Sequence, residues 1–186
     1  MQAYINPPKK LPWYIRLGVY IGKLITGKEL LPAKLLAWFP RAAIASGIFE
    51  ISIAGEKDMD GRLLKLFRLQ CSLTASCPFC FDMNSVDAQK YNITEEEFKV
   101  LQKQDSLNRV SSFEPGEKLA LEYARKLSSS PISILPEFIN ELKKHYTEKE
   151  IVILAYTAAQ VNYWARLIQG LGVPPAGFTD RCTTNI

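Results

Sequence analysis

Helical periodicity runs through almost the whole chain and limits the possible fold more than any other feature of the sequence. Apolar residues recur at intervals of three and four, whereas the alternation typical of strands is hard to find. The first helix, for example, carries a stripe at positions 13, 17, 20, 21 and 24. We expect helices over residues 12–25, 32–53, 62–75, 78–91, 116–127, 136–146 and 148–169, with a short one after Thr94. The sequence therefore predicts an all-α helical bundle in a single domain.

Local signals fix several of the predicted helix ends. Thr94 and Glu97 have the spacing of a capping box, and so do Thr147 and Glu150 at the start of the long apolar helix. Pro40 is expected to kink or split the second helix, because proline removes a backbone donor and clashes with the preceding turn.

Composition excludes several classes of protein. With 186 residues, of which 47% are hydrophobic and 23% charged, the chain is neither disordered nor collagen-like and can build one sizeable core. Its longest candidate for a membrane span, Ile151 to Ala165, is shorter than the roughly 20 residues that a bilayer needs. The N-terminus shows no pattern of a secretory signal. We expect no transmembrane segment and a cytoplasmic location.

Charge is distributed unevenly along the chain. Residues 1–49 contain seven basic residues and one acidic residue, whereas the remainder contains 16 basic and 18 acidic residues. A basic arm could meet an anionic lipid, nucleic acid or acidic partner, but the scattered charges favour the solvated face of a docked helix pair, and no nucleic acid is expected. The predicted organisation is a basic helical extension (1–34), a helical domain (35–178) and a tail (179–186).

Two of the four cysteines form the motif Cys77-Pro-Phe-Cys80, which points to redox chemistry. Pro78 suits the first position of a helix, so Cys77 becomes its cap and Cys80 lies in its first turn. A thiolate there is stabilised by unpaired amides and by the helix dipole, which lowers its pKa below about 8.5. The second cysteine can then resolve an oxidised intermediate as a disulfide. The alternative is that both are small buried hydrophobic residues.

The remaining cysteines and the single histidine favour no metal site. A zinc site would need Cys71 together with Cys182 or His145 to join the pair, and nothing in the sequence brings them together. We expect Cys71 in the core, Cys182 as an exposed tail thiol and His145 on the surface, with no cofactor.

The cysteine motif and its surroundings resemble the carboxymuconolactone decarboxylase and alkylhydroperoxidase D-like superfamily. The likeness begins with the run Cys77 to Ser85, Ala88 and residues 92–97 (NITEEE). It continues through residues 113–124 (FEPGEKLALEYA), through the stretch from Glu148 past Asn162 to Arg166, and through residues 171–178 (LGVPPAGF). It covers about residues 35–178 and leaves the basic arm as an extension.

The resemblance implies an all-α fold, homo-oligomers and a thiol peroxidase or disulfide reductase cycle. In that cycle Cys80 would attack a hydroperoxide or disulfide substrate. Cys77 would resolve the intermediate and exchange with a dithiol reductant, such as a lipoyl group or a thioredoxin-like protein. The dipole argument instead makes Cys77 the more acidic thiol, so the sequence leaves the two roles open.

The proton relay that the resemblance implies is absent. Its glutamate, twelve residues before the first cysteine, is Lys65, and its histidine, four residues after the second, is Asn84; a histidine seen between the cysteines in some members is Phe79. Asparagine cannot exchange protons but can orient a water or a thiol. Lys65 could lower a cysteine pKa by its charge, or it could be a solvated surface lysine.

Other residues near the motif have two possible roles. Asp82 and Asp87 could replace the missing base, although each is otherwise a surface acid. Asn162, Tyr163, Trp164 and Arg166, on the long apolar helix, could line a pocket or an interface, and an interface is favoured.

The predicted function is thiol–disulfide oxidation and reduction, with weak hydroperoxide reduction by Cys77 and Cys80 and with Asn84 and Lys65 as further site residues. The first alternative is an oligomeric scaffold or binding protein that lost turnover together with the relay. A third option is a small-molecule enzyme that uses Lys65 or Asp82. A decarboxylase is disfavoured, because that branch acts on a lactone acid without a cysteine pair.

Overall fold

The chain folds entirely into helices. The computed structural model describes residues 2–53, 57–103 and 106–179, and no strand occurs within these ranges. The elements are α1 (Trp13–Thr26), α2 (Leu31–Leu35), η1 (Leu36–Trp38), α3 (Pro40–Ile51), α4 (Gly61–Thr74), α5 (Pro78–Ser85), η2 (Ala88–Tyr91), α6 (Glu95–Gln102), η3 (Leu107–Arg109), α7 (Pro115–Ser128), α8 (Pro136–Leu142) and α9 (Glu148–Gly170). The predicted all-α class is confirmed. Among the described helices, none has the length and apolar character to cross a membrane.

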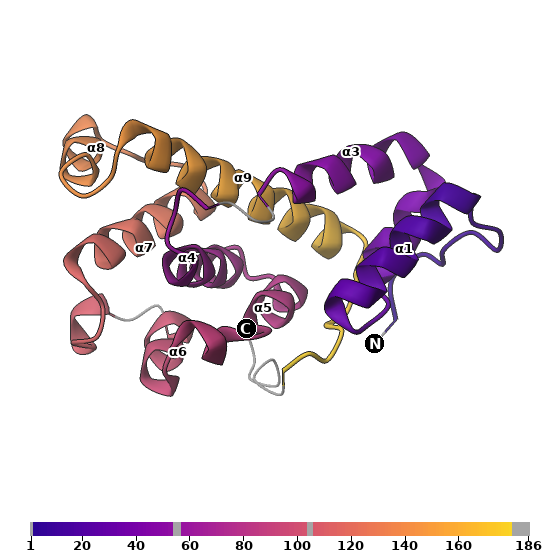
Figure 1. Cartoon of the computed structure of the whole chain (residues 1–186), viewed down its shortest axis with the longest axis horizontal. Coiled ribbons are helices and arrows are strands. Elements are labelled where there is room, and N and C mark those ends of the chain that lie inside the picture. Colours follow the sequence, from indigo (N-terminus) through magenta and orange to yellow (C-terminus); the bar gives the residue numbers. More distant parts are fainter. Residues whose placement is uncertain (1, 54–56, 104–105, 180–186) are drawn as a thin grey trace.

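Helix α4 forms the centre of the larger group of helices. It packs against α5, α7 and α9, which surround it in Figure 1. Its side chains point into the core on most sides, so that Leu66, Phe67 and Leu69 are fully buried. Cys71 is also fully buried, which confirms its predicted place in the core. The sequence forms a helix here because its apolar residues cover more than one face, as expected for a central element.

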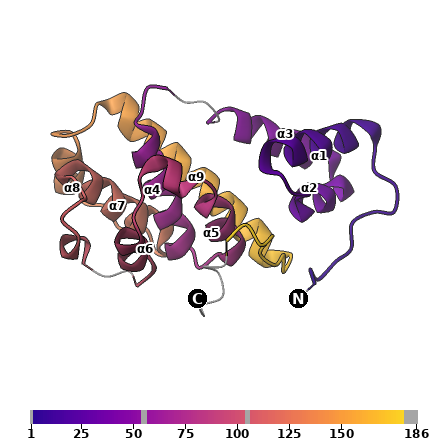
Figure 2. The ribbon, with the colours of Figure 1, turned by 60° about the horizontal axis from the view of Figure 1, so that its bottom comes forward.

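Helices α1, α2 and α3 form a second group beside the first (Figures 1 and 2). Helix α3 lies along α9, where the Ser46 and Tyr163 hydroxyls are 2.8 Å apart and Gln160 Nε2 donates to the Phe49 carbonyl at 3.0 Å. The irregular segment before α1 also contacts the bundle, because the Tyr4 amide donates to the Leu171 carbonyl at 3.0 Å. The N-terminal part of the chain therefore contacts α9 in its middle, at Gln160 and Tyr163, and just after its end, at Leu171.

Both predicted capping boxes are confirmed. Thr94 and Thr147 each accept a hydrogen bond from the amide three residues on, and Glu97 and Glu150 return the contact to the cap amide. Glu114 begins α7 with the same reciprocal pattern. Pro40 splits the predicted second helix, since α3 starts at this residue after a break at Phe39.

The predicted helix over residues 78–91 is wrong in its second half. Helix α5 ends at Ser85, because Val86 leaves the helical conformation with ψ of 134° and Asp87 has the left-handed φ of 58°. Asn92, with φ of 54°, ends the short η2 that follows. Aspartate and asparagine tolerate this conformation better than most residues, so the chain reverses direction here without glycine. The helix expected over 136–146 likewise ends at Leu142.

Candidate active site

Cys77 and Cys80 form a disulfide at the N-terminus of α5. Pro78 occupies the first helical position and Cys77 is the cap, as predicted. The Cys80 amide donates to Cys77 Sγ at 3.2 Å, and the two Cα atoms are 5.2 Å apart. A sulfur that caps a helix accepts an amide proton and feels the positive end of the dipole. The structure therefore shows the pair oxidised, with Cys77 Sγ at the end of the helix where an amide hydrogen bond and the dipole favour negative charge.

The disulfide is buried in an apolar group that we call the cysteine cluster. Cys77 has no exposed surface and Cys80 is 4% exposed. The cluster joins α2, α5, α9 and the C-terminal segment, and its buried members are Leu35, Ala75, Cys77, Phe79, Cys80, Ala165, Ile168 and Val173. Trp164, Met83 and Leu171 are partly buried against it. The sulfurs therefore lie within an apolar cluster whose edge includes these partly buried side chains.

Asn84 lies one turn of α5 beyond Cys80, on the same face of the helix. Its Nδ2 donates to Ser72 Oγ at 2.9 Å, and its Oδ1 accepts from Arg68 Nε at 2.9 Å. The Ser72 carbonyl in turn accepts from the Cys77 amide at 3.0 Å. The amide of Asn84 is thus held in one orientation at the α4–α5 contact, close to the motif.

Arg68 extends these contacts to α3 and α9. Its Nη1 donates to Gln160 Oε1 at 2.6 Å, and its Nη2 lies 4.0 Å from Glu50 Oε2. The indole nitrogen of Trp164 donates to Glu50 Oε1. Burial lowers the pKa of Arg68, and the Glu50 carboxylate partly opposes this shift. We call this set the Arg68 network: Glu50, Arg68, Ser72, Asn84, Gln160 and Trp164.

Lys65 lies farther along the same face of α4. It precedes Ser72 by seven residues, which is about 10 Å along a helix axis. Its ammonium lies over the Tyr91 ring, 5.6 Å from the centroid. Burial, and next the charge of Arg68, lower the pKa of Lys65 to about 8, while Asp87 acts in the opposite direction. The structure therefore places Lys65 against Tyr91 and Arg68 between it and the motif.

Asp82 is not the surface acid expected from the sequence. It is fully buried, and its carboxylate oxygens accept from the amides of Gly177 and Thr179, each at 2.8 Å. These backbone partners explain why a charged group is tolerated there. Asp82 fixes the C-terminal segment to α5. Asp87, by contrast, is half-exposed and pairs with Lys90 at 2.9 Å.

The other described residues that were singled out from the sequence lie at different places in the structure, outside the cysteine cluster. Asn162 Nδ2 donates to Ser128 Oγ of α7 at 2.9 Å, whereas Arg166 is exposed. His145 is exposed, as predicted. Cys71 belongs to the core cluster around Phe67 rather than to the cysteine cluster. Cys182 lies outside the described residues.

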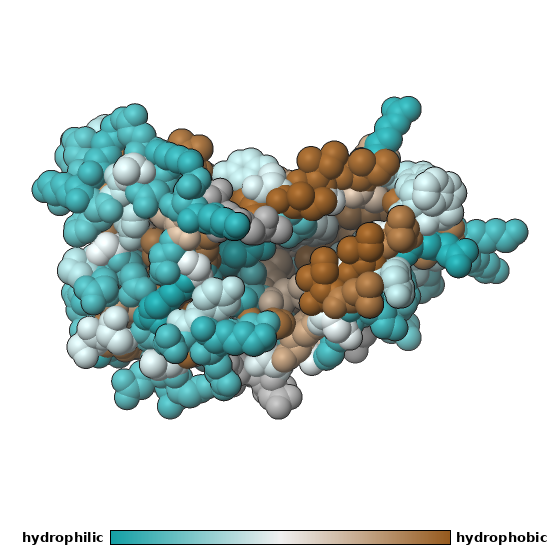
Figure 3. Space-filling view, viewed as in Figure 1, coloured by the Kyte–Doolittle hydropathy of each residue, from teal (hydrophilic) through white to brown (hydrophobic). Residues whose placement is uncertain are grey.

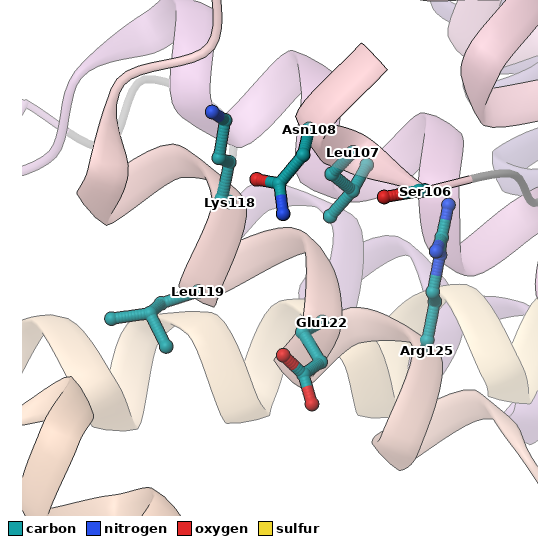
Figure 4. A pocket seen from close by; sticks show the side chains of 7 residues that line it. All are labelled: Ser106, Leu107, Asn108, Lys118, Leu119, Glu122 and Arg125. Carbon is teal, nitrogen blue, oxygen red and sulfur yellow. The ribbon is translucent and has the colours of Figure 1, made fainter. Parts of the chain in front are cut away.

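A shallow groove of about 380 Å³ lies on another part of the surface (Figure 4). Its lining comes from η3 and α7, with Ser106, Asn108, Lys118, Glu122 and Arg125 among the polar side chains. None of its lining residues belongs to the cysteine cluster or to the Arg68 network. The groove is therefore separate from the cysteine motif.

Comparison with known proteins places the chain in a family. No family model matches it. It is 30% identical over 109 residues to the uncharacterized protein YdfG of Bacillus subtilis, a match that covers 58% of this chain and 72% of that protein. The chain belongs to the YdfG family.

Solved structures show the fold of this YdfG-family protein. The debrominase Bmp8, as a cysteine-to-alanine variant with 2,3,4-tribromopyrrole, matches with a TM-score of 0.82 and 17% identity over 98% of this chain and 96% of that one. A peroxidase-related protein of Ralstonia eutropha with an alkylhydroperoxidase AhpD core gives 0.80 and 14% over 98% and 95%. A putative antioxidant defence protein of Agrobacterium tumefaciens gives 0.66 and 18% over 75% and 94%. The alkylhydroperoxidase D-like fold expected from the motif is confirmed.

Most of the Arg68 network was not predicted from the sequence. Asn84 and Trp164 were singled out, but the other members, which are far apart along the chain, were not: Glu50, Arg68, Ser72 and Gln160. One signal was present: positions 65, 68 and 72 share a face of the helix predicted over residues 62–75. That face carries two cations and a hydroxyl, which is unusual for a helix as buried as α4.

Proposed function

We propose that this protein is a thiol–disulfide oxidoreductase that reduces hydroperoxides through Cys77 and Cys80. The observation that carries the proposal is the disulfide across the first turn of α5, with Cys77 as the cap. The fold likeness to a peroxidase-related protein and to a putative antioxidant defence protein supports it. In a helix-initial pair of this kind, both the thiolate and the disulfide are chemically accessible states.

The proposed cycle balances with a hydroperoxide as oxidant and a dithiol as reductant. A thiolate of the pair attacks the terminal peroxide oxygen, the O–O bond breaks, and an alcohol leaves with a proton from water. The resulting sulfenic acid condenses with the second thiol to form the disulfide and water. A lipoyl-type or thioredoxin-like dithiol then reduces this disulfide by two exchange steps and is itself oxidised.

The reduced wild-type protein tests the proposal directly. One equivalent of an organic hydroperoxide is expected to produce one Cys77–Cys80 disulfide and one equivalent of alcohol. Peptide mass spectrometry detects the bond, and a dithiol is expected to restore the free thiols. A reduced pair that survives the hydroperoxide unchanged would contradict the peroxidase proposal and favour a scaffold without turnover.

Reductive dehalogenation is a second candidate, because the debrominase Bmp8 shares the fold and the sulfurs lie in an apolar cluster beside Trp164. A dithiol and a bromoarene would yield the disulfide, the debrominated arene, bromide and a proton. Bromide release from 2,3,4-tribromopyrrole by the reduced protein, measured by ion chromatography, distinguishes this activity from peroxide reduction. Disulfide formation without bromide would exclude it for this substrate.

We further propose that a second copy of the chain covers an exposed apolar face on the N-terminal helices. Figure 3 shows apolar side chains gathered over α1 and α3. The stripe predicted in the first helix faces outward: Trp13 is 75% exposed and Leu24 67%. The exposed large apolar residues of this face are Trp13, Tyr14, Leu17, Tyr20, Ile21, Leu24, Ile25, Trp38, Phe39, Ile44, Ile48 and Ile51.

The size and spacing of this face favour a helical partner. Each large side chain of the face contributes on the order of 100 Å² of apolar area. The total therefore exceeds the few hundred Å² of contiguous apolar surface that a monomer usually exposes. It also meets the roughly 800 Å² per partner of a stable interface. Trp13, Leu17, Tyr20 and Leu24 are spaced by four, three and four residues, as in the seam between two helices.

Charge placed on this face is expected to separate the copies. Leu17→Glu and Ile48→Glu should each convert an oligomer into a monomer, because an unpaired carboxylate cannot be buried in an apolar contact. Light scattering after gel filtration measures the mass. Ile132→Glu is the control, since Ile132 is 61% exposed but lies outside α1–α3. A wild-type protein that is monomeric at high concentration would refute the second copy.

A further inference from the structure

Arg68 lies beside the cysteine motif, where the glutamate and histidine of the proton relay are absent. Arg68 is joined to the motif through two side chains: Asn84, one turn from Cys80, and Ser72, whose carbonyl accepts the Cys77 amide. Ser72 Oγ also donates to the Arg68 carbonyl at 2.8 Å. The guanidinium thereby hydrogen-bonds to α5 at Asn84, which lies one helical turn beyond Cys80.

The hydrogen-bond acceptors described for the Arg68 side chain are neutral and do not cancel its charge. Asn84 and Gln160 are neutral acceptors at 2.9 and 2.6 Å. Among the described residues, Glu50 has the one carboxylate within ion-pair distance of Arg68. Its Oε2 lies 4.0 Å from Arg68 Nη2, and the Glu50 side chain is 44% exposed. An ion pair at this distance, open to solvent on the acidic side, screens the cation only in part. A net positive charge therefore remains beside the motif.

The other titratable groups near Arg68 do not remove this charge. Burial raises the pKa of the Cys71 thiol to about 12, so that this thiol stays neutral. Lys65 adds a second positive charge and loses it only as the pH rises through about 8. Asp82 uses both of its oxygens on the amides of Gly177 and Thr179, and Asp87 pairs with Lys90.

We infer that Arg68 stabilises the thiolate of the reduced cysteine pair by its charge, and that Glu50 limits this effect by partly neutralising Arg68. The inference rests on the proposed dithiol cycle. Arginine never releases its proton at physiological pH, so it acts as a fixed cation rather than as a base. The thiol gives its proton to solvent, the thiolate attacks the peroxide oxygen, and the leaving alkoxide takes a proton from water. Arg68 and Glu50 are thus positioning residues of the site.

The inference predicts shifts of opposite sign in two variants. Arg68→Gln removes the cation and is expected to raise the lowest thiol pKa of the pair by about one unit. Glu50→Gln removes the opposing anion and is expected to lower that pKa by several tenths of a unit. Loss of structure would move both variants in the same direction. The same variant distinguishes a second role for Glu50. If Glu50 were a general base, Glu50→Gln would slow oxidation without lowering the thiol pKa.

The measurement is peptide-resolved alkylation of the reduced full-length protein between about pH 5 and about pH 10, a range that brackets the pKa of a perturbed cysteine. Mass spectrometry separates Cys77 and Cys80 from Cys71 and Cys182. Lys99→Gln, an exposed change on α6, is the control for a lost positive charge. Arg68→Lys is expected to recover part of the shift. Far-ultraviolet circular dichroism establishes that each variant is folded.

The outcomes separate this inference from the proposed function. An unchanged thiol pKa in folded Arg68→Gln overturns the inference, even if the pair cycles with hydroperoxide. An unchanged or raised pKa in Glu50→Gln overturns it as well, and this variant keeps the test valid if Arg68→Gln does not fold. Opposite shifts of the thiol pKa in the two variants support the inference. If they occur while hydroperoxide leaves the wild-type pair reduced, the inference holds and only the proposed peroxidase activity fails.

Discussion

The Cys80→Ser variant is expected to lose hydroperoxide turnover by roughly 10³-fold or more, as enzymes do when their nucleophile is removed. The expectation follows from the proposed role of Cys80 as the attacking thiol, on the first turn of α5 and one turn from Asn84. Serine is nearly the same size, so the cysteine cluster should keep its packing. A coupled assay that follows dithiol consumption measures the rate.

Cys77→Ser provides the matched comparison. It is expected to react with one equivalent of hydroperoxide and then to stop, because Cys80 forms a sulfenic acid that no neighbouring thiol resolves. A dimedone adduct on Cys80 identifies this state by mass. If Cys80→Ser instead shows the adduct on Cys77, the roles of the two cysteines are reversed. If the double variant Cys77→Ser, Cys80→Ser retains turnover, the cysteine mechanism is refuted.

Arg62→Ala is expected to lower the free energy of unfolding by about 3 kcal/mol, the lower end for a broken buried ion pair. Arg62 Nη2 donates to Glu97 Oε1 at 2.6 Å and Nε donates to Glu117 Oε1 at 2.9 Å. The Glu97 side chain has no exposed surface, so its charge would be left buried without its cation. Urea unfolding followed by circular dichroism gives the difference.

The loss in Arg62→Ala is expected to depend on pH. Burial acts to raise the pKa of Glu97, but hydrogen bonds from Arg62, Ser112 and the Thr94 amide outweigh it and hold this pKa below 4.5. The stabilisation is therefore complete above pH 4.5 and is lost as the pH falls through the lowered value. The wild type and the variant should converge in acid. Lys144→Ala, which removes an exposed pair with Glu141, is expected to cost less than about 0.5 kcal/mol.

Sequence reasoning predicted the helices well because their signals are local. Caps such as Thr147 and Cys77 act through residues three positions away, so their geometry follows from spacing alone. The same reasoning failed at Asp87, where the chain adopts a left-handed conformation that no periodic pattern announces. It also gave no indication that the stripe on α1 faces outward, because periodicity marks an apolar face without identifying what covers it.

The candidate site could be predicted only in part, for a related reason. The two cysteines of the pair are three positions apart in the sequence and were found from this spacing. The Arg68 network joins positions 50, 68, 84 and 160, and its existence depends on how α3 and α9 cross α4. Asp82 was misjudged because its partners are backbone amides almost a hundred residues away, and any residue type can supply those.

The cover over the disulfide has a kinetic consequence. Cys77 has no exposed surface, and Leu35 of α2 and Trp164 of α9 form part of its surroundings. In the proposed cycle, a reagent that attacks Cys77 therefore meets a transiently opened form of the protein, whose population is set by a local free energy rather than by global unfolding. When opening is fast, the observed rate of each thiol reaction scales with that population. Leu35 of α2 and Trp164 of α9 belong to the contacts that such an opening would have to loosen.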